Sequence, residues 1–378
     1  MRRVIVTLGI AALLLLAGCA APEAVAPSPT KPPGAVPAAS TPGVPASAAP
    51  KAAATAPASD RMAQLIEAAR KEGTVNWAIT PPFFDGVGPM RDLIKQKYGV
   101  DLKIEASSEL NYTRKVAKIV SEVQAGAPAS FDLIDLSDST VAPLLQAGAA
   151  LKVNWQEYMP QIPAEGVIGD GILLVNYNDF LGPVFNPKII PADQAPRSYD
   201  DLLDPKWKGK ISTIDAQSNW VWLAQPDLWG EARLKEFMKG LKKQNPFIGR
   251  YDEMQARLTS GEYPLSAGIT ASTVTVAQRK GAPLEYAKVT PMRVGAYGSA
   301  VPKNAPHPNA AILLALATLL PEAQAVRDQM SGGSLGWVEG TYANKFIKEN
   351  KVAKVDVAFG QKNSERLAAE ISDIMRGN

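Results

Sequence analysis

The chain contains one cysteine and one histidine in 378 residues. The single cysteine, Cys19, excludes an intrachain disulfide. The single histidine, His307, excludes zinc sites built from several histidines and leaves one candidate for catalysis that needs imidazole. Strong charge is also missing, since the net charge is +3 with 20% charged residues and no run of Lys and Arg stands out. A nucleic-acid-binding role is therefore not expected.

The order of the residues argues against a serine hydrolase. Gly332–Gly336 reads Gly-Gly-Ser-Leu-Gly and matches the pattern G-x-S-x-G. That motif needs a strand before the serine and a histidine later in the chain. Here the preceding sequence is helical, and His307 comes before Ser334. We predict that the protein is not an enzyme and uses neither a cofactor nor a metal.

Residues 1–19 have the composition of a signal peptide. A basic start precedes an apolar segment, residues 4–16, which is too short to span a membrane as a helix. The following Leu-Ala-Gly-Cys ends at Cys19 and resembles a lipobox, where a bacterial lipoprotein signal is cleaved before a lipid-modified cysteine. Residues 20–59 are rich in Ala, Pro, Ser and Thr and cannot bury a core. We predict an extracytoplasmic protein, anchored to the cell membrane by a lipid on Cys19, with residues 20–59 as a disordered tether.

The remainder of the chain alternates strand-like and helix-like segments. Strands are predicted at residues 74–79, 100–106 and 131–136, with amphipathic helices between them. This order is typical of a parallel sheet with helical crossovers, so the predicted fold class is α/β. With 46% hydrophobic residues, the chain has enough apolar surface for two domains.

Residues 197–215 begin the second half of the predicted fold. Ser198 and Asp201 form a capping-box-like start to a short helix. Pro205 ends that helix, because proline has no amide proton to donate. A buried strand follows at residues 211–214 and ends in Asp215. Open α/β sheets bind ligands beyond such strand ends.

Three segments resemble one family. Tyr199–Ile211 (YDDLLDPKWKGKI) is similar to the entry into the second lobe of extracellular solute-binding proteins of the iron, polyamine and phosphonate type. Val301–Gln324 resembles the family's return to the first lobe, and Phe131–Ala150 resembles its third strand and the next helix. The resemblance implies a two-lobed, type II periplasmic-binding-protein fold with a ligand cleft between the lobes. It implies crossover strands near residues 172–186 and 292–300, a lobe one of residues 60–175 and 295–378, and a lobe two of residues 176–294.

The resemblance also implies a function. A small-molecule solute would bind in the cleft, and the lobes would close on it by a hinge motion. The permease and ATPase subunits of an ABC importer would then take the solute from a monomeric receptor. A ligand-sensing partner of a membrane kinase would bind a solute in the same way, and the sequence does not separate these two roles.

In this layout, the loops that follow the strands of both lobes face one cleft, which gives candidate ligand-binding residues by position. In lobe one they are Thr80, Phe83, Ser107, Ser108, Ser137 and Asp138. In lobe two they are Asp215, Ser218, Trp220, Ile269, Thr270 and Ser272, with Tyr297 near the return strand. Ser218 and Thr270 are also predicted N-caps, and helix N-termini attract anions. Trp220 and Trp222 would lie about 200° apart on a helix, so at most one of them should face the cleft.

The sequence favours one class of ligand over two others. The family's ferric-binding members use two adjacent tyrosines, but no Tyr-Tyr pair occurs in the chain, and Gly268–Thr273 stands at the expected place. A polyamine needs carboxylates and aromatic faces, which Asp85, Asp138, Asp215 and Trp220 would supply. Hydroxyl groups at strand ends, with helix N-termini behind them, favour a phosphonate, phosphate ester or carboxylate. We predict a small polar, anionic organic solute, with ferric ion and polyamine as alternatives.

Overall fold

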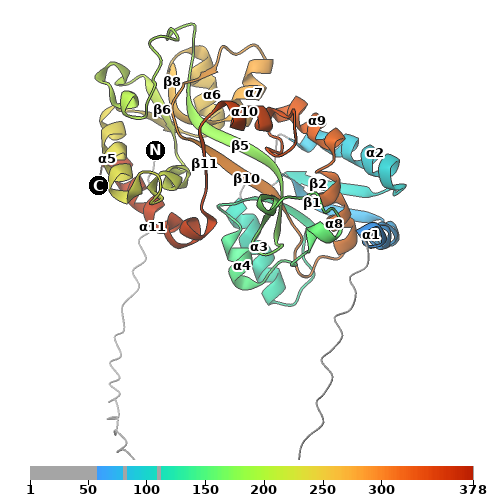
Figure 1. The fold of residues 1–378 in the computed structure, drawn as a ribbon. Helices are drawn as coiled ribbons and strands as arrows, with labels where there is room; N and C mark the ends of the chain where they lie inside the picture. Colours follow the sequence, from blue (N-terminus) through green and yellow to red (C-terminus); the bar gives the residue numbers. More distant parts are fainter. Residues whose placement is uncertain (1–57, 80–82, 109–111, 378) are drawn as a thin grey trace, which may run out of the picture. The chain divides into compact units, whose positions relative to one another are not determined.

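A single mixed sheet of 11 strands organises the protein (Figure 1). The computed structural model describes residues 58–79, 83–108 and 112–377. The predicted signal peptide, the tether up to residue 57, Cys19 and Thr80 lie outside these described residues.

The strands are β1 (Thr74–Ile79), β2 (Lys103–Ser108), β3 (Leu133–Ser137), β4 (Val167–Ile168), β5 (Leu173–Phe185), β6 (Ile211–Ile214), β7 (Phe247–Gly249), β8 (Leu265–Thr270), β9 (Glu285–Tyr286), β10 (Met292–Ala300) and β11 (Val352–Lys354). The α-helices are α1 (Ala58–Glu72), α2 (Val87–Tyr98), α3 (Tyr112–Gln124), α4 (Ala142–Ala147), α5 (Gly230–Lys243), α6 (Tyr251–Ser260), α7 (Ala271–Arg279), α8 (Pro308–Ala317), α9 (Pro321–Ser331), α10 (Tyr342–Glu349) and α11 (Val357–Arg376). Short 3₁₀ helices are η1 (Phe83–Gly86), η2 (Trp155–Glu157), η3 (Ala164–Gly166), η4 (Asp200–Leu203), η5 (Pro205–Trp207) and η6 (Gln217–Ala224).

Two long strands join two groups of parallel strands. The strand order is β2-β1-β3-β10-β5-β8-β6-β7, in which β1 pairs in parallel with β2 and β3, and β6 pairs in parallel with β7 and β8. Between these groups, β5 and β10 run antiparallel to each other. With 13 residues, β5 reaches about 40 Å and can belong to both groups. The crossover strands expected near residues 172–186 and 292–300 are therefore present, and the fold is two-lobed.

Each group of parallel strands has its own hydrophobic core. The lobe-one core packs β1 and β3 against α1, α2 and α8 and includes Trp77, Leu133 and Leu314. The lobe-two core packs β6 and β8 against η6, α5 and α6. Helix α8 is buried from residue 310 to its end, because its sequence after Pro308 and Asn309 is an unbroken apolar run.

The last helix corrects the expected boundary of lobe one at residue 378. Leu367, Ile371 and Met375 of α11 are buried in the lobe-two core. They recur every four residues and so form one apolar stripe, which packs on η6 and α5. Strand β11, which pairs with β10, leads the chain back to lobe two.

The segment around Ser198 folds largely as predicted. Asp201 Oδ2 accepts a hydrogen bond from Ser198 N at 3.0 Å, and Ser198 Oγ accepts one from Asp201 N at 3.2 Å. The turns that follow are the 3₁₀ helices η4 and η5 rather than an α-helix. Strand β6 then begins at Ile211, as expected.

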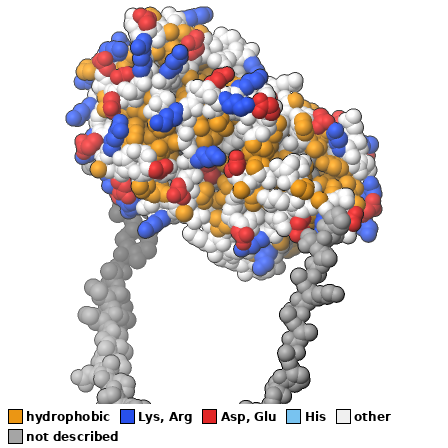
Figure 2. Space-filling model, viewed as in Figure 1, with side chains coloured by type: hydrophobic (Ala, Val, Ile, Leu, Met, Phe, Trp, Pro, Cys, Tyr) orange, Lys and Arg blue, Asp and Glu red, His pale blue; other side chains and the backbone are white. Residues whose placement is uncertain are grey.

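Two surface properties bear on the partners of the protein. On the face shown in Figure 2, basic and acidic side chains are interspersed. Among the described residues, no single helix is long and apolar enough to cross a membrane. Helices α8 and α9, bent by 72° at the break between them, meet that criterion only as a pair and by length and composition alone.

Candidate ligand-binding cleft

Four polar side chains of the two crossover strands share one face of the sheet. In their register, Tyr297 lies opposite Tyr177, and Arg293 lies opposite Leu181. Because side chains alternate along a strand, Arg293, Tyr297, Tyr177 and Asp179 share one face. On the other face, Phe180 and Val294 pack in an apolar cluster with Ala343 and Phe346 of α10. The polar face therefore forms the floor of the junction between the lobes.

A buried ion pair ties lobe one to this floor. Asp138, in the loop after β3, accepts a hydrogen bond from Arg293 Nη2 at 3.1 Å, and its Oδ2 accepts one from Ala296 N at 2.9 Å. Only 4% of Asp138 and 6% of Arg293 are exposed, so the pair is shielded from water. Burial raises the pKa of the Asp138 carboxyl, although Arg293 and the backbone donors oppose the shift. The Asp138 carboxylate is thus already engaged by the protein.

A second buried carboxylate ties lobe two to the floor. Asp179 Oδ1 accepts hydrogen bonds from Ser272 N at 3.0 Å and from Phe180 N at 2.8 Å, and Oδ2 accepts one from Ser272 Oγ. Asp179 therefore occupies the N-terminus of α7, where an anion was expected to bind. Thr270 does stand at the N-cap position, but its Oγ1 pairs with Thr273 Oγ1 at 2.8 Å and caps no backbone amide.

Aromatic rings and a guanidinium group form a continuous stack across lobe one. The rings of Tyr297 and Tyr177 are parallel within 10°, with their centroids 4.8 Å apart. Arg327 of α9 lies over the Tyr177 ring at 4.4 Å and over the Phe83 ring at 4.0 Å. We call these four residues the Arg327 stack. Burial raises the pKa of Tyr297 to about 12, against the opposing effect of Arg293.

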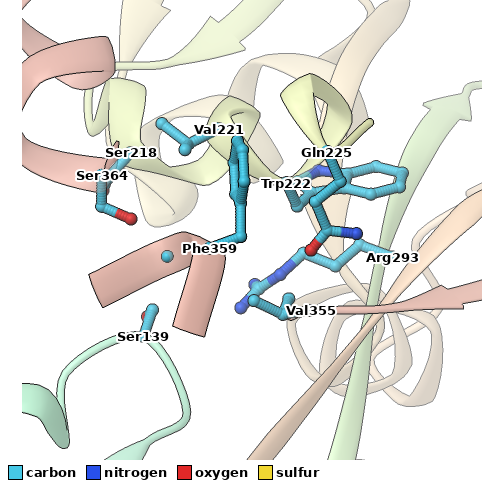
Figure 3. A pocket seen from close by; sticks show the side chains of 10 residues that line it. Ser139, Ser218, Val221, Trp222, Gln225, Arg293, Val355, Phe359 and Ser364 are labelled. Atoms are coloured by element: carbon cyan, nitrogen blue, oxygen red, sulfur yellow. The ribbon is translucent and has the colours of Figure 1, made fainter. Parts of the chain in front are cut away.

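A small cavity of about 20 Å³ lies where the lobes meet (Figure 3). It is lined by Ser139 of lobe one, Ser218 and Trp222 of η6, Arg293 of β10, and Phe359 and Ser364 of α11. This volume holds about one water molecule. In Figure 3 the side chain of Arg293 extends toward Val355 and Phe359. Residues of both lobes therefore line this cavity around Arg293.

The structure brings only some of the predicted site residues to this junction. Asp138 and Tyr297 lie on the floor, Ser272 contacts Asp179, and Ser218 lines the cavity. Ser137 Oγ pairs with Ser139 Oγ at 2.9 Å and so lies beside the cavity. Ser107, Ser108 and Asp215 stand exposed at the ends of their strands.

Three predicted site residues belong to the core. Trp220 packs against Phe237 with ring centroids 5.6 Å apart, and Ile269 is fully buried in the lobe-two core. Phe83 is 1% exposed and takes part in the Arg327 stack.

Ser218 lies inside η6, which starts at Gln217, so it is not the predicted N-cap. Of the two tryptophans, Trp222 lines the cavity, in agreement with the expectation that at most one faces the cleft.

Several residues of the junction were not predicted. They are Tyr177, Asp179, Arg293 and Arg327, together with Tyr251, whose buried hydroxyl lies within electrostatic range of Arg293 and Asp179. The first three were detectable, because polar residues interrupt otherwise apolar strands, at residues 176–179 in β5 and at Arg293 in β10. No such signal marks Arg327, because an arginine within a helical segment is normally expected on the exposed face of the helix.

The serine and the histidine considered for a hydrolase bond to different residues. Ser334 Oγ accepts a hydrogen bond from Ala343 N, and His307 Nδ1 lies 3.0 Å from Asp132 Oδ2. The two residues of the supposed hydrolase motif thus have separate partners. Among the described residues, no three His, Cys, Asp or Glu side chains gather in a way that could hold a metal ion.

Two α/β lobes joined by two crossover strands, with a polar junction between them, define a two-lobed binding protein. The chain belongs to the family of bacterial extracellular solute-binding proteins, whose family model matches residues 90–354. Membership of this family places the protein outside the cytoplasm and identifies it as a solute-binding protein of a transport system. No curated protein shows a significant match to the sequence.

Solved structures share the fold at low sequence identity. Iron-bound HitA from Pseudomonas aeruginosa is 19% identical, with a TM-score of 0.63 over 79% of this chain and 99% of its own. AgtB from A. tumefaciens R10, in complex with agropinic acid, is 17% identical, with a TM-score of 0.60 over 80% of this chain and 99% of its own. An ABC transporter substrate-binding protein from Bradyrhizobium japonicum is 14% identical, with a TM-score of 0.66 over 80% and 99%. HitA and AgtB carry chemically different ligands, so the shared fold does not determine the solute.

Proposed function

We propose that this protein is the lipid-anchored receptor of an ABC importer and that it captures a small, anionic organic solute in the cleft between its lobes. The predicted signal peptide and lipobox at Cys19 support the anchor. The family and the two-lobed fold support the role of a monomeric receptor that delivers its solute to permease and ATPase subunits.

One observation carries the anionic character of the solute. Both buried carboxylates of the junction are engaged by the protein's own donors: Asp138 by Arg293 and Ala296, and Asp179 by Ser272 and Phe180. In contrast, three buried donors around the same floor have no hydrogen-bond partner among the described residues: Arg327 Nη2, Tyr251 Oη and Trp222 Nε1. A buried donor without an acceptor is costly, and an acceptor-rich ligand would satisfy all three.

The hydrogen-bond partners and the exposure of the candidate residues also argue against a polyamine as the solute. Of the groups that would hold its cationic amines, Asp138 is paired with Arg293, and Trp220 is in the core. Asp85 and Asp215 are exposed to solvent. None of these four residues offers a buried, unpaired carboxylate or a free aromatic face.

A ferric ion is disfavoured for a different reason. Iron would need phenolates, and burial raises the pKa values of Tyr177, Tyr251 and Tyr297 above that of an ordinary tyrosine. Burial in the junction therefore favours neutral phenols, which are hydrogen-bond donors. Two buried acceptors, Gln217 Oε1 and Asp328 Oδ1, also lack partners among the described residues, so a hydroxyl or amino group on the acidic solute would find acceptors there.

Thermal unfolding with a panel of solutes tests the proposal. The panel contains succinate, malate, citrate, gluconate, 3-phosphonopropionate and glycerol 3-phosphate, with spermidine and ferric nitrilotriacetate as the competing classes. A solute that binds only the folded state raises its stability by about 2.7 kcal/mol at a hundredfold excess over Kd. We expect at least one acid to stabilise the protein specifically. Stabilisation by spermidine or ferric ion alone would overturn the anionic assignment.

A further inference from the structure

Two buried arginines face the junction, and they differ in how their charge is balanced. Arg293 is paired with Asp138 at 3.1 Å. Arg327 is only 3% exposed and, among the described residues, forms no ion pair, and its Nη2 has no hydrogen-bond partner. Its contacts are instead the faces of two rings, those of Phe83 and Tyr177. Burial lowers the pKa of Arg327, although Tyr177 and Asp135 oppose the shift.

The rings stabilise the guanidinium group without satisfying its donors. A cation over an aromatic face is attracted by the ring's quadrupole, and the planar guanidinium group stacks between two such faces. The two rings contact the guanidinium group but accept no hydrogen bond from Nη2. This donor is therefore left without an acceptor by the part of the chain that the structure describes.

The place of Arg327 in the fold is where the two lobes meet. Phe83 follows β1 and so lies beyond the carboxyl end of a parallel strand, the position at which such sheets bind ligands. Tyr177 is on the polar floor, stacked on Tyr297. The next residue of α9, Asp328, accepts a hydrogen bond through its carbonyl from Arg279 of α7, in lobe two. Arg327 thus lies beside the floor and next to a contact between the lobes.

We propose that Arg327, oriented between Phe83 and Tyr177, binds the acidic group of the solute and sets the preference for an acid over its neutral analogue. This inference rests on the proposed function, since it assigns an anchor within the same cleft. A guanidinium group forms two parallel hydrogen bonds to a carboxylate or a phosphonate, and both groups share this chemistry. The stack holds the guanidinium group ready for this geometry before the solute arrives.

Substitution of Arg327 gives the test, on the full-length protein purified in mild detergent. Probes of equal chain length are succinate, 3-phosphonopropionate and the neutral succinamide, besides any acid from the panel that stabilises the wild type. Binding is measured by calorimetry and by thermal unfolding. We expect Arg327→Gln to weaken binding of the preferred acid about 10- to 100-fold, as for loss of a hydrogen bond to a charged group. The response to succinamide should not change, and the ratio between the two acids identifies carboxylate or phosphonate as the favoured group.

The unfolding temperature without ligand distinguishes a residue that binds the solute from one that only stabilises the fold. Removing a buried, unpaired charge relieves a cost of folding, so Arg327→Gln should unfold without ligand at the same temperature as the wild type or higher. A large drop in that temperature would assign Arg327 to the scaffold and overturn the inference. Arg91→Gln is the matched control, because it removes the same charge from a side chain of lobe one that is 53% exposed. It should bind every probe as the wild type does.

Two other outcomes are distinguishable. If the wild type binds no acid, the proposed function fails and the inference fails with it. If the wild type binds an acid and Arg327→Gln binds it equally well, only the anchor is wrong. Should Arg327→Gln not fold, Arg327→Lys carries the test, because a lysine keeps the charge but lacks the planar fork. An unchanged affinity of Arg327→Lys would then overturn the inference, and a loss of about tenfold would support it.

Discussion

The carboxylate of Asp179 lies at the N-terminus of α7, where its Oδ1 accepts a hydrogen bond from Ser272 N at 3.0 Å. A crossover strand is thereby bound to the first turn of a lobe-two helix. The contact also occupies a position that would otherwise attract an external anion. The anionic solute proposed here must therefore use other donors, which the junction offers at Arg327, Tyr251 and Trp222.

Removing the Asp179 carboxylate should expose the anion site of α7. In Asp179→Ala, the amide of Ser272 loses its acceptor, and we expect a loss of about 1–3 kcal/mol of unfolding free energy. Sulfate should restore part of this loss, because it can bind at the freed helix N-terminus. Urea unfolding with and without sulfate measures both effects. Asp215→Ala, which removes an exposed carboxylate, serves as control, and an equal sulfate response in the two variants would contradict the prediction.

The Asp138–Arg293 pair should behave as a buried ion pair. Replacing one partner leaves the other charge buried and unpaired, so Asp138→Asn and Arg293→Gln should each cost about 3–5 kcal/mol of unfolding free energy. The double variant should cost clearly less than the sum of the two, because neither charge remains. Chemical denaturation of the wild type, the two single variants and the double variant gives the coupling energy of the pair. Additive losses would show that the two groups stabilise the junction independently.

Tyr297 should link stability to alkaline pH. Its pKa is raised from 10.0 to about 12 in the folded protein by burial. A raised pKa means that the folded state favours the protonated phenol. The stability that this preference contributes is full below pH 10 and is lost as the pH rises through about 12.

The comparison with Tyr297→Phe isolates this effect. The unfolding free energy of the wild type minus that of the variant should fall across this pH window, as measured by urea unfolding at each pH. A difference that stays constant with pH would contradict the raised pKa.

Gly298 tests the pairing of the crossover strands. A Cβ at this position would overlap the carbonyl oxygen of Leu174 on β5, which is backbone and cannot rotate away. Gly298→Ala should therefore cost at least about 1–3 kcal/mol of unfolding free energy. Gly88→Ala is the matched control, because a Cβ there meets open space on α2 and should stabilise the helix by about 0.5–1 kcal/mol. Equal stability of both variants would mean that β10 and β5 pair differently.

The anchor predicted at Cys19 has a direct test. Cys19→Ser removes the thiol that a lipid would modify, so the chain should remain unlipidated and lose its normal membrane anchoring. Fractionation of cells and mass spectrometry of the N-terminus measure this. Lipid-anchored protein recovered from the serine variant would rule out the lipobox.

Local patterns of the sequence predict most of the elements but not how their side chains meet. Strands β1 and β6 begin and end at the predicted residues, because short apolar runs are bounded there by turn residues. The polar floor depends on the register between β5 and β10, which brings Tyr177 beside Tyr297 from 120 residues away. The packing of α11 on lobe two and the burial of Arg327 are likewise long-range contacts. No spacing within a single segment encodes them.

The positions of β10 and α11 in the sheet and core also fix the order in which the chain can fold. The sheet of lobe one needs β10, which ends at Ala300, between β3 and β5. The core of lobe two needs Met375 of α11. Lobe one therefore cannot be complete before β10 has been synthesised, nor lobe two before α11, and folding of this kind is slowed by its long-range contacts.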